Sequence, residues 1–247
     1  MTRLPFRLAL LAIAFGSFGA STQIAAQESA RSDRYGTWTF DLGGQLAQPI
    51  GEFRSQIDRA WGVGGSVRYH MRELRLLGLR GDASWLNYGN ETKNVPLSPT
   101  VNRVFVDMRT TNNIALATIG PELLISSGPV RPYAYAFAGY SYFYTESSAG
   151  DDNGGEAFAS TTNFDDGGWA TGWGGGVRIP VVVRSVEAAF DVGARLTRNG
   201  TRSYLRSGDI IDLPDRTLAI NPRRTSADFW QYHLGVSFSP RRRDRGR

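Results

Sequence analysis

Residues 169–196 read WATGWGGGVRIPVVVRSVEAAFDVGARL, and this stretch decides the fold. Apolar residues occupy every second position through both halves of the stretch, as at Trp173 and Val177. Glycines and charges of both signs fill the positions between them, as at Arg178 and Asp191. Because successive side chains of a strand point to opposite faces, the stretch predicts a hairpin of two strands with one apolar and one polar face.

The polar face of this hairpin decides which kind of β-protein the chain forms. A soluble sandwich also alternates, but it turns its apolar face inward and its polar face to water. Here glycines lie beside opposite charges, which suits a narrow polar interior better than open water. An apolar exterior around a polar interior is typical of a transmembrane β-barrel. We therefore expect the apolar face to meet lipid.

The composition of the 247 residues excludes several classes of protein. Hydrophobic residues make up 41% and charged residues 21%, which excludes a disordered chain. Cysteine is absent, which excludes a disulfide framework, a thiolate metal site and a cysteine nucleophile. The net charge of +5 is local, because residues 241–247 alone contribute +4 and Arg3 and Arg7 contribute two more charges. The rest of the chain is close to neutral, so we expect no binding to nucleic acid.

Residues 1–26 have the pattern of a secretory signal peptide. Two arginines form a charged start, residues 8–15 are apolar, and small residues lead to Ala26. The apolar run is too short to cross a bilayer, so we expect cleavage after Ala26 rather than retention as an anchor. A short N-terminal segment, 27–34, follows. No later apolar stretch is long enough for a membrane-spanning helix, so insertion into a membrane must use strands.

Eight strand-like segments with a period of two follow the predicted signal. They cover residues 37–47, 60–70, 75–88, 112–126, 132–145, the two halves of 169–196, and 227–239. In the fifth segment we assign the apolar face to Tyr133, Tyr135 and Phe137. The fourth changes parity at Pro121, which cannot donate to the sheet ladder and so predicts a β-bulge. The predicted fold is all-β, an eight-stranded antiparallel transmembrane up-and-down β-barrel over 35–239.

The connections between these segments alternate in length. Short ones fall at 71–74, 127–131 and 182–184, and long polar ones at 48–59, 89–111, 146–168 and 199–226. Short turns at one end and long loops at the other describe a bacterial outer-membrane barrel, with turns in the periplasm and loops outside. Aromatic residues near the segment ends predict the two interfacial girdles. These residues are Trp38, Trp61, Trp85, Tyr88, Tyr133, Tyr144, Trp169 and Trp230.

Two segments carry a more specific resemblance. Residues 132–140, PYAYAFAGY, and 172–178, GWGGGVR, are similar to the fifth and sixth strands of the small outer-membrane β-barrel family of the OmpA-barrel and OmpX kind. The resemblance covers 35–239. It implies the outer membrane of a Gram-negative-type bacterium, with outer-membrane lipid, lipopolysaccharide and the barrel-assembly machinery as partners. Members usually end on an aromatic residue that this machinery reads, whereas here a basic periplasmic tail, 240–247, follows Phe238 and Ser239.

Charges of both signs share the inward parity of the predicted strands. They are Asp41, Arg68, Arg80, Asp82, Arg178, Glu187, Asp191 and Arg195. Eight strands leave an interior just wide enough for side chains, so we expect paired charges to plug the lumen. A short turn near Val182 predicts that Arg178 pairs with Glu187 across the sixth and seventh strands.

Few residues are candidates for catalysis. The two histidines, His70 and His233, share the lumen face with Ser66 and Ser237. Barrel-type lipid-A hydrolases expose their serine and histidine to lipid, and this parity forbids such an arrangement. We therefore expect no catalytic residue.

Acidic residues gather in the third long loop, at 151–156 and at Asp165 and Asp166. Carboxylates of this kind suit a hard cation such as calcium, but their order matches no EF-hand, so the prediction is a solvated acidic loop. The same carboxylates can also bridge to lipopolysaccharide phosphates through divalent cations. We expect no cofactor, no cofactor-binding residue and no metal-binding residue.

The predicted function is non-enzymatic, a structural or surface-interaction role through four extracellular loops. Transport of small or apolar solutes through the barrel is the alternative, and a lipid-modifying outer-membrane enzyme comes third. Paired lumen charges favour a plug over a conduit, and only an outward-facing Ser/His pair supports the enzyme. The sequence names no ligand for the loops.

Overall fold

The computed structural model describes residues 38–71, 76–96, 105–125, 128–150, 159–182, 186–212 and 218–240. The predicted signal peptide, the segment 27–34, the arginines of the tail and the acidic residues 151–156 lie outside the described residues. Among the residues that are described, no helix is long and apolar enough to cross a membrane.

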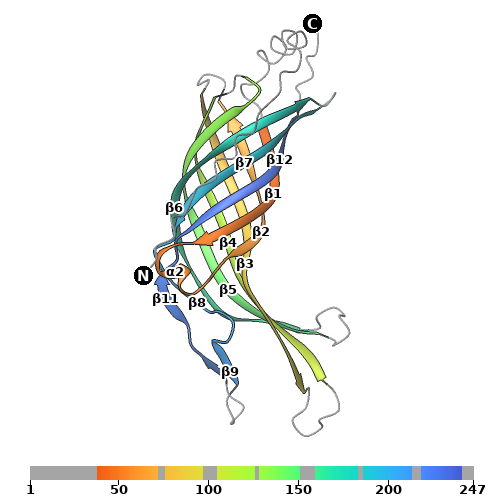
Figure 1. Cartoon of the computed structure of the whole chain (residues 1–247), viewed down its shortest axis with the longest axis vertical. Coiled ribbons are helices and arrows are strands. Elements are labelled where there is room, and N and C mark those ends of the chain that lie inside the picture. Colours follow the sequence, from red (N-terminus) through yellow and green to blue (C-terminus); the bar gives the residue numbers. More distant parts are fainter. Residues whose placement is uncertain are drawn as a thin grey trace, which may run out of the picture. The chain divides into compact units, whose positions relative to one another are not determined.

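Eight antiparallel strands close into a barrel, which confirms the predicted fold class. They are β1 (Trp38–Pro49), β2 (Ala60–His70), β3 (Leu77–Pro96), β4 (Phe105–Leu124), β5 (Arg131–Gly150), β6 (Ala159–Val182), β7 (Val186–Arg198) and β12 (Phe229–Pro240). Each barrel strand pairs with the next one along the chain, and β1 pairs with β12 to close the ring (Figure 1). The hairpin predicted at residues 169–196 is β6–β7, in which Val177 pairs with Val192.

The barrel wall has an apolar outer face and a polar inner face. On β1, Asp41 is 8% exposed whereas its neighbour Leu42 is 66% exposed. The outer apolar face of this strand runs from Trp38 to Leu46, which pairs with Trp61 of β2. The eight steps between these nine residues, at about 3.3 Å each and tilted by about 40°, span about 20 Å across a membrane. This height is close to the ~25 Å apolar band of outer-membrane barrels.

The predicted aromatic girdles are confirmed in part. Trp38, Trp61, Trp85 and Trp169 are exposed, and Tyr144 and Trp230 are partly exposed. The indole of Trp85 donates a hydrogen bond to the Tyr144 hydroxyl at 3.0 Å. The prediction is wrong for Tyr88 and Tyr133, which are 8% and 5% exposed and face the lumen. The outer surface also carries Tyr69, Tyr140, Tyr142, Trp173 and Tyr232.

The face assigned to β5 as apolar is the lumen face and not the lipid face. Tyr133, Tyr135 and Phe137 are buried, and the alanines between them are exposed. The register places each ring opposite a glycine of β6. The pairs are Tyr133–Gly176, Tyr135–Gly174 and Phe137–Gly172. A Cβ at Gly174 would lie 2.8 Å from the Tyr135 ring, so the glycines leave the space that the rings occupy.

The β-bulge predicted at Pro121 is wrong. β4 keeps one register with both β3 and β5 on either side of Pro121, which is exposed. Ile114 and Leu116 face the lumen, whereas Leu123 is 56% exposed, so the parity never changes. Apolar lumen residues near one end of the strand produce the apparent change. The bulge in this pair of strands lies at residues 87–89 of β3.

At the end of the barrel that carries the long connections, called here the loop end, β3 to β6 extend beyond the prediction. β3 and β4 stay paired as far as Pro96 and Phe105, and β5 and β6 as far as Ala149 and Ala159. Much of the loops predicted at 89–111 and 146–168 is therefore strand. The extensions are largely polar, so the apolar period of two that reveals the barrel strands is missing there.

The two remaining connections complete the loop end. The connection between β1 and β2 contains a short helix, α2 (Gly51–Arg54). The connection between β7 and β12 contains β8 (Thr201–Tyr204), β9 (Ile210–Asp212), β10 (Leu218–Ile220) and β11 (Arg223–Ser226). β8 pairs with β11 and β9 with β10. The Asn199 amide donates to the Ala227 carbonyl at 2.6 Å, which ties the two ends of this connection together.

Candidate functional site

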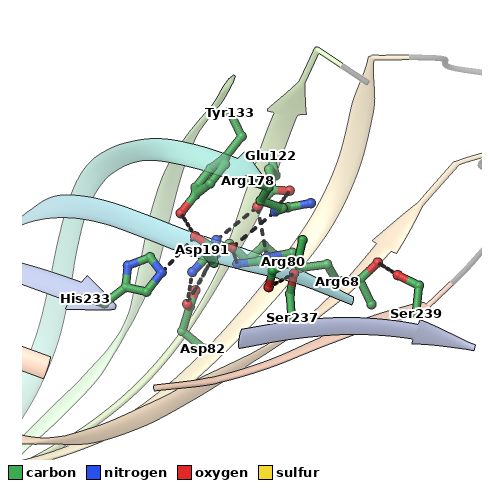
Figure 2. A network of polar contacts seen from close by, with 12 residues as sticks. Arg68, Arg80, Asp82, Glu122, Tyr133, Arg178, Asp191, His233, Ser237 and Ser239 are labelled. Atoms are coloured by element: carbon green, nitrogen blue, oxygen red, sulfur yellow. Dashed lines mark hydrogen bonds and ion pairs between the residues drawn. The ribbon is translucent and has the colours of Figure 1, made fainter. Parts of the chain in front are cut away.

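A cluster of paired charges fills the lumen toward the opposite end of the barrel, called here the turn end (Figure 2). At its centre is Glu122 of β4, which is fully buried. Its carboxylate lies 2.5 Å from Arg178, 3.1 Å from Arg80 and 3.3 Å from Arg68. His70 Nε2 lies 3.6 Å from the same carboxylate. Because these partners come from β2, β3 and β6, a single side chain of β4 links four strands.

Asp191 of β7 is the second centre of the cluster and is also fully buried. Its Oδ2 atom accepts hydrogen bonds from Arg68 at 2.8 Å and from Arg178 at 3.2 Å. Its Oδ1 atom accepts one from the Tyr133 hydroxyl at 2.6 Å and lies 2.9 Å from His233 Nε2. Arg68 and Arg178 thus bridge the two buried carboxylates.

The arginines also pack against the aromatic residues of β5. The guanidinium of Arg80 lies 4.2 Å from the ring centre of Tyr135, and that of Arg178 lies 4.7 Å from Tyr133. Arg195 lies 5.3 Å from the centre of Phe137. Contacts of this kind attract a cation to the ring face, and more strongly where water is excluded. The rings opposite the β6 glycines therefore form the wall against which the charged cluster packs.

All eight predicted lumen charges lie on the lumen face of their strands, but the predicted pairing is wrong. Arg178 pairs with Asp191, because the β6–β7 register places these residues opposite each other. Glu187 lies opposite Val182 near the turn end, is partly exposed, and pairs with Arg131 of β5. The predicted pair needed a register four residues away from the observed one.

Glu122 is not among the predicted lumen charges. The parity change predicted at Pro121 puts Leu123 on the lipid face, and it therefore already places the neighbouring Glu122 toward the lumen. Its signal is an isolated carboxylate in a strand whose other lumen-facing residues are uncharged.

A second plug, made of apolar side chains, closes the lumen at the loop end. Phe53 of α2 is 1% exposed and inserts among aromatic rings from the barrel wall and from β8. Its ring centre lies 5.0 Å from that of Tyr204 and 6.2 Å from that of Phe143. Burial raises the pKa of the Tyr204 phenol above its ordinary value. The described lumen is filled by charges in one half and by aromatic residues in the other.

The candidate catalytic residues do not assemble into a nucleophile and base. Both histidines face the lumen as predicted, His70 toward Glu122 and His233 toward Asp191. Ser237 donates to a backbone carbonyl, that of Ala189, at 3.4 Å. Within the described ranges, neither Ser66 nor Ser237 hydrogen-bonds to a histidine.

The acidic residues of the third long loop divide between two settings. Asp165 and Asp166 belong to β6, and Asp166 accepts a hydrogen bond from the Ser203 backbone at 2.5 Å. Asp166 therefore links β6 to β8. The other acidic residues of this group, 151–156, fall outside the described residues.

The two plugs predict a barrel that does not conduct. The purified wild-type protein, reconstituted in planar bilayers, is expected to show no steady ion current, because charged and aromatic side chains fill the described lumen. A porin inserted in the same apparatus controls for detection. Large and stable single-channel currents from the wild type contradict the prediction.

An apolar exterior, a closed ring of eight strands and a filled lumen define a small membrane-embedded β-barrel. The chain belongs to the outer membrane protein beta-barrel domain family, whose model matches residues 9–239. Its place is therefore the outer membrane of a Gram-negative-type bacterium, where its outer face meets membrane lipid. No curated protein sequence matches the chain.

Several solved outer-membrane proteins are similar to the chain. Ail, the attachment invasion locus protein of Yersinia pestis, is 11% identical with a TM-score of 0.44, over 83% of this chain and 99% of that one. OprG of Pseudomonas aeruginosa is 13% identical with a TM-score of 0.45, over 85% and 98%. A major outer membrane protein of Thermus thermophilus is 12% identical with a TM-score of 0.44, over 82% and 99%.

Proposed function

We propose that this protein is a non-enzymatic outer-membrane barrel that acts through its loop end, with the closed barrel as its anchor. The observation that carries the proposal is the contrast between the two parts of the molecule. The described lumen is filled, whereas β3 to β6 continue past the apolar band as two paired hairpins. A conduit needs an open lumen, and a surface platform needs an extended, rigid structure above the membrane.

The extended hairpins are built for rigidity. Backbone pairing continues to their described ends, and polar side chains bridge neighbouring strands. The Thr110 and Ser147 hydroxyls hydrogen-bond at 2.8 Å, and the Asn163 amide donates to Ser147 at 2.6 Å. From residue 87 to residue 96, β3 alone adds about 30 Å of strand beyond its last outward tryptophan. This length supports presentation of a surface well away from the lipid.

The two edges of the extended sheet differ. On the β3 edge, Glu91 accepts a hydrogen bond from the Gly208 backbone at 3.0 Å, and Lys93 donates to the Ile210 carbonyl at 3.5 Å. Charged side chains and covering loops are devices that protect sheet edges from pairing. The β6 edge, residues 159–164, reads ASTTNF, without charge or proline, and no described strand pairs with its outer side. The β6 edge therefore supports binding of a partner by strand addition.

The surroundings of the barrel follow from the same proposal. The loop end lies outside the cell among lipopolysaccharide, and the turn end lies in the periplasm. Phe238 serves as the aromatic residue that the barrel-assembly machinery reads, although Ser239 and the basic tail follow it in the chain. Its side chain is 45% exposed on the outer face, where its ring packs 5.7 Å from that of Phe40.

The proposal is tested by separating surface binding from permeability. A strain without the gene is complemented with the wild type or with one of two variants. In the first variant a tight turn replaces residues 147–162 and shortens the β5–β6 hairpin. In the second, the control, a tight turn replaces residues 94–107 and shortens the β3–β4 hairpin. Surface attachment and uptake of small and apolar solutes are then measured for each strain. We expect attachment to fall without the gene and with the β5–β6 truncation, to persist with the β3–β4 truncation, and uptake to stay unchanged. Loss of uptake without the gene, with attachment intact, would instead support transport.

A further inference from the structure

One carboxylate of the lumen, that of Asp41, forms no ion pair within the part of the chain that the structure describes. Asp41 of β1 is 8% exposed, and its Oδ2 atom has no hydrogen-bond partner among the described residues. The other carboxylates of the charged cluster, Asp82, Glu122 and Asp191, each form an ion pair with an arginine. A buried carboxylate oxygen without a partner is unfavourable, so a group that binds this oxygen of Asp41 stabilises it.

Two further ligand atoms lie next to Asp41. A carboxylate oxygen of Asp191 and a ring nitrogen of His233 lie within 4.8 Å of a carboxylate oxygen of Asp41 and of each other. Asp41 and His233 also line a small hollow of about 10 Å³, together with Gly65 and the side chains of Arg80 and Arg195. That volume is roughly what one water molecule needs. Three ligand atoms and room for a water therefore converge on one buried place.

We propose that Asp41, Asp191 and His233 bind one divalent transition-metal ion of the Zn²⁺ type, with a water in the adjoining hollow as a further ligand. One imidazole and two carboxylates suit Zn²⁺, whereas Ca²⁺ and Mg²⁺ take oxygen ligands. Tetrahedral zinc places its ligand atoms about 3.4 Å apart. Asp191 Oδ1 and His233 Nε2 lie 2.9 Å apart and need to separate slightly, and a carboxylate oxygen of Asp41, within 4.8 Å of both, completes the set.

The surrounding hydrogen bonds leave one ligand atom of Asp191 for the ion. Its Oδ2 atom keeps both arginine contacts, which hold the carboxylate in place as outer-shell partners do in metal sites. Its Oδ1 atom faces His233 and exchanges the hydrogen bond from Tyr133 for the metal. His233 then binds through Nε2 in its neutral form.

The location gives the ion a structural role. Asp41 lies on β1, His233 on β12 and Asp191 on β7, which are consecutive strands of the ring. The β1–β12 pair joins the first and last barrel strands. A metal shared by these residues therefore fastens the closure of the barrel. Asp41 and Asp191 are 150 residues apart in the chain, and Asp191 and His233 are 42 apart, so the ligands form no local sequence motif.

Zinc binding by the full-length protein tests the proposal. The chain is refolded in detergent with a chelator, exchanged into chelator-free buffer, and titrated with ZnCl₂ by calorimetry and by thermal unfolding. We expect one zinc ion per barrel and a higher unfolding temperature with zinc. D41N and H233Q are each expected to weaken binding at least tenfold. H70Q, at the other buried histidine, is the control and keeps binding.

Three results overturn the proposal: no zinc binding by the wild type, wild-type affinity in D41N and H233Q, or an equal loss in H70Q. If a variant does not fold, NMR of the imidazole nitrogens in the wild-type protein tests the proposal instead. The His233 signals are assigned by comparison with H70Q or by through-bond correlation. On addition of zinc, these signals are expected to take the chemical shifts of a metal-bound imidazole. An imidazolium signal that zinc leaves unchanged shows that a proton occupies the place assigned to the metal, and it overturns the proposal.

Discussion

Replacement of Glu122 by alanine is expected to lower the free energy of unfolding of the barrel by about 3–5 kcal/mol. The change removes the carboxylate that three guanidiniums of the lumen share. Arg68 and Arg178 keep Asp191 and Arg80 keeps Asp82, but these three buried guanidiniums are then left with two ion-paired carboxylates instead of three. Uncompensated buried charge is costly because little solvent remains to screen it.

The matched control is Glu187→Ala, which removes a carboxylate from an ion pair that is partly exposed near the turn end. Solvent screens such a pair, so the expected loss is about 0–1 kcal/mol. Urea unfolding of both variants in lipid vesicles, followed by tryptophan fluorescence, measures the difference. Equal stability of the two variants would show that the Glu122 cluster is hydrated and contributes little.

Replacement of Leu234 by arginine is expected to lower the free energy of unfolding by about 2–4 kcal/mol. Leu234 of β12 is 64% exposed on the outer face and pairs with Val192 of β7. This position lies between the rows of outward aromatic residues, so a charge there faces the hydrocarbon interior of the bilayer. The same unfolding measurement in vesicles gives the result.

Leu46→Arg is the matched control for this change. Leu46 is also exposed on the outer face, but it pairs with Trp61 at the loop-end row of aromatic residues, where arginine reaches the lipid headgroups. The expected loss there is about 0–1 kcal/mol. A loss at Leu46 as large as at Leu234 would contradict the assigned position of the membrane.

Local alternation predicted the barrel wall well, except where apolar residues turn inward. The outer faces of β1, β2 and β3 follow the predicted parity, from Trp38 and Trp61 to Trp85. In the first half of β5, Tyr133, Tyr135 and Phe137 face the lumen, and the lipid face carries the alanines between them. A rule that places the larger apolar residues outside therefore chose the wrong face. Only the glycines on the facing strand β6 could have revealed that the lumen has room for these rings.

The extended hairpins show a second limit of the pattern. Residues 89–96 and 146–150 form strands although their sequence has no apolar period, because their backbone groups pair with a neighbouring strand. Strands that are paired through their backbones but have two polar faces show no alternation of apolar and polar residues. The sequence pattern therefore predicts loops at these residues.

The sequence by itself determined the number of barrel strands, the lipid-facing residues of most of them, and the presence of balanced charges in the lumen. These properties depend on the period of two along a single strand, which is local. The tertiary structure alone decided which charges meet. Glu122 is joined by Arg68, Arg80 and Arg178 from three other strands, and Arg178 meets Asp191 instead of Glu187. These contacts depend on the register of every strand pair around the ring, and a shift in one pair changes the partners across the lumen.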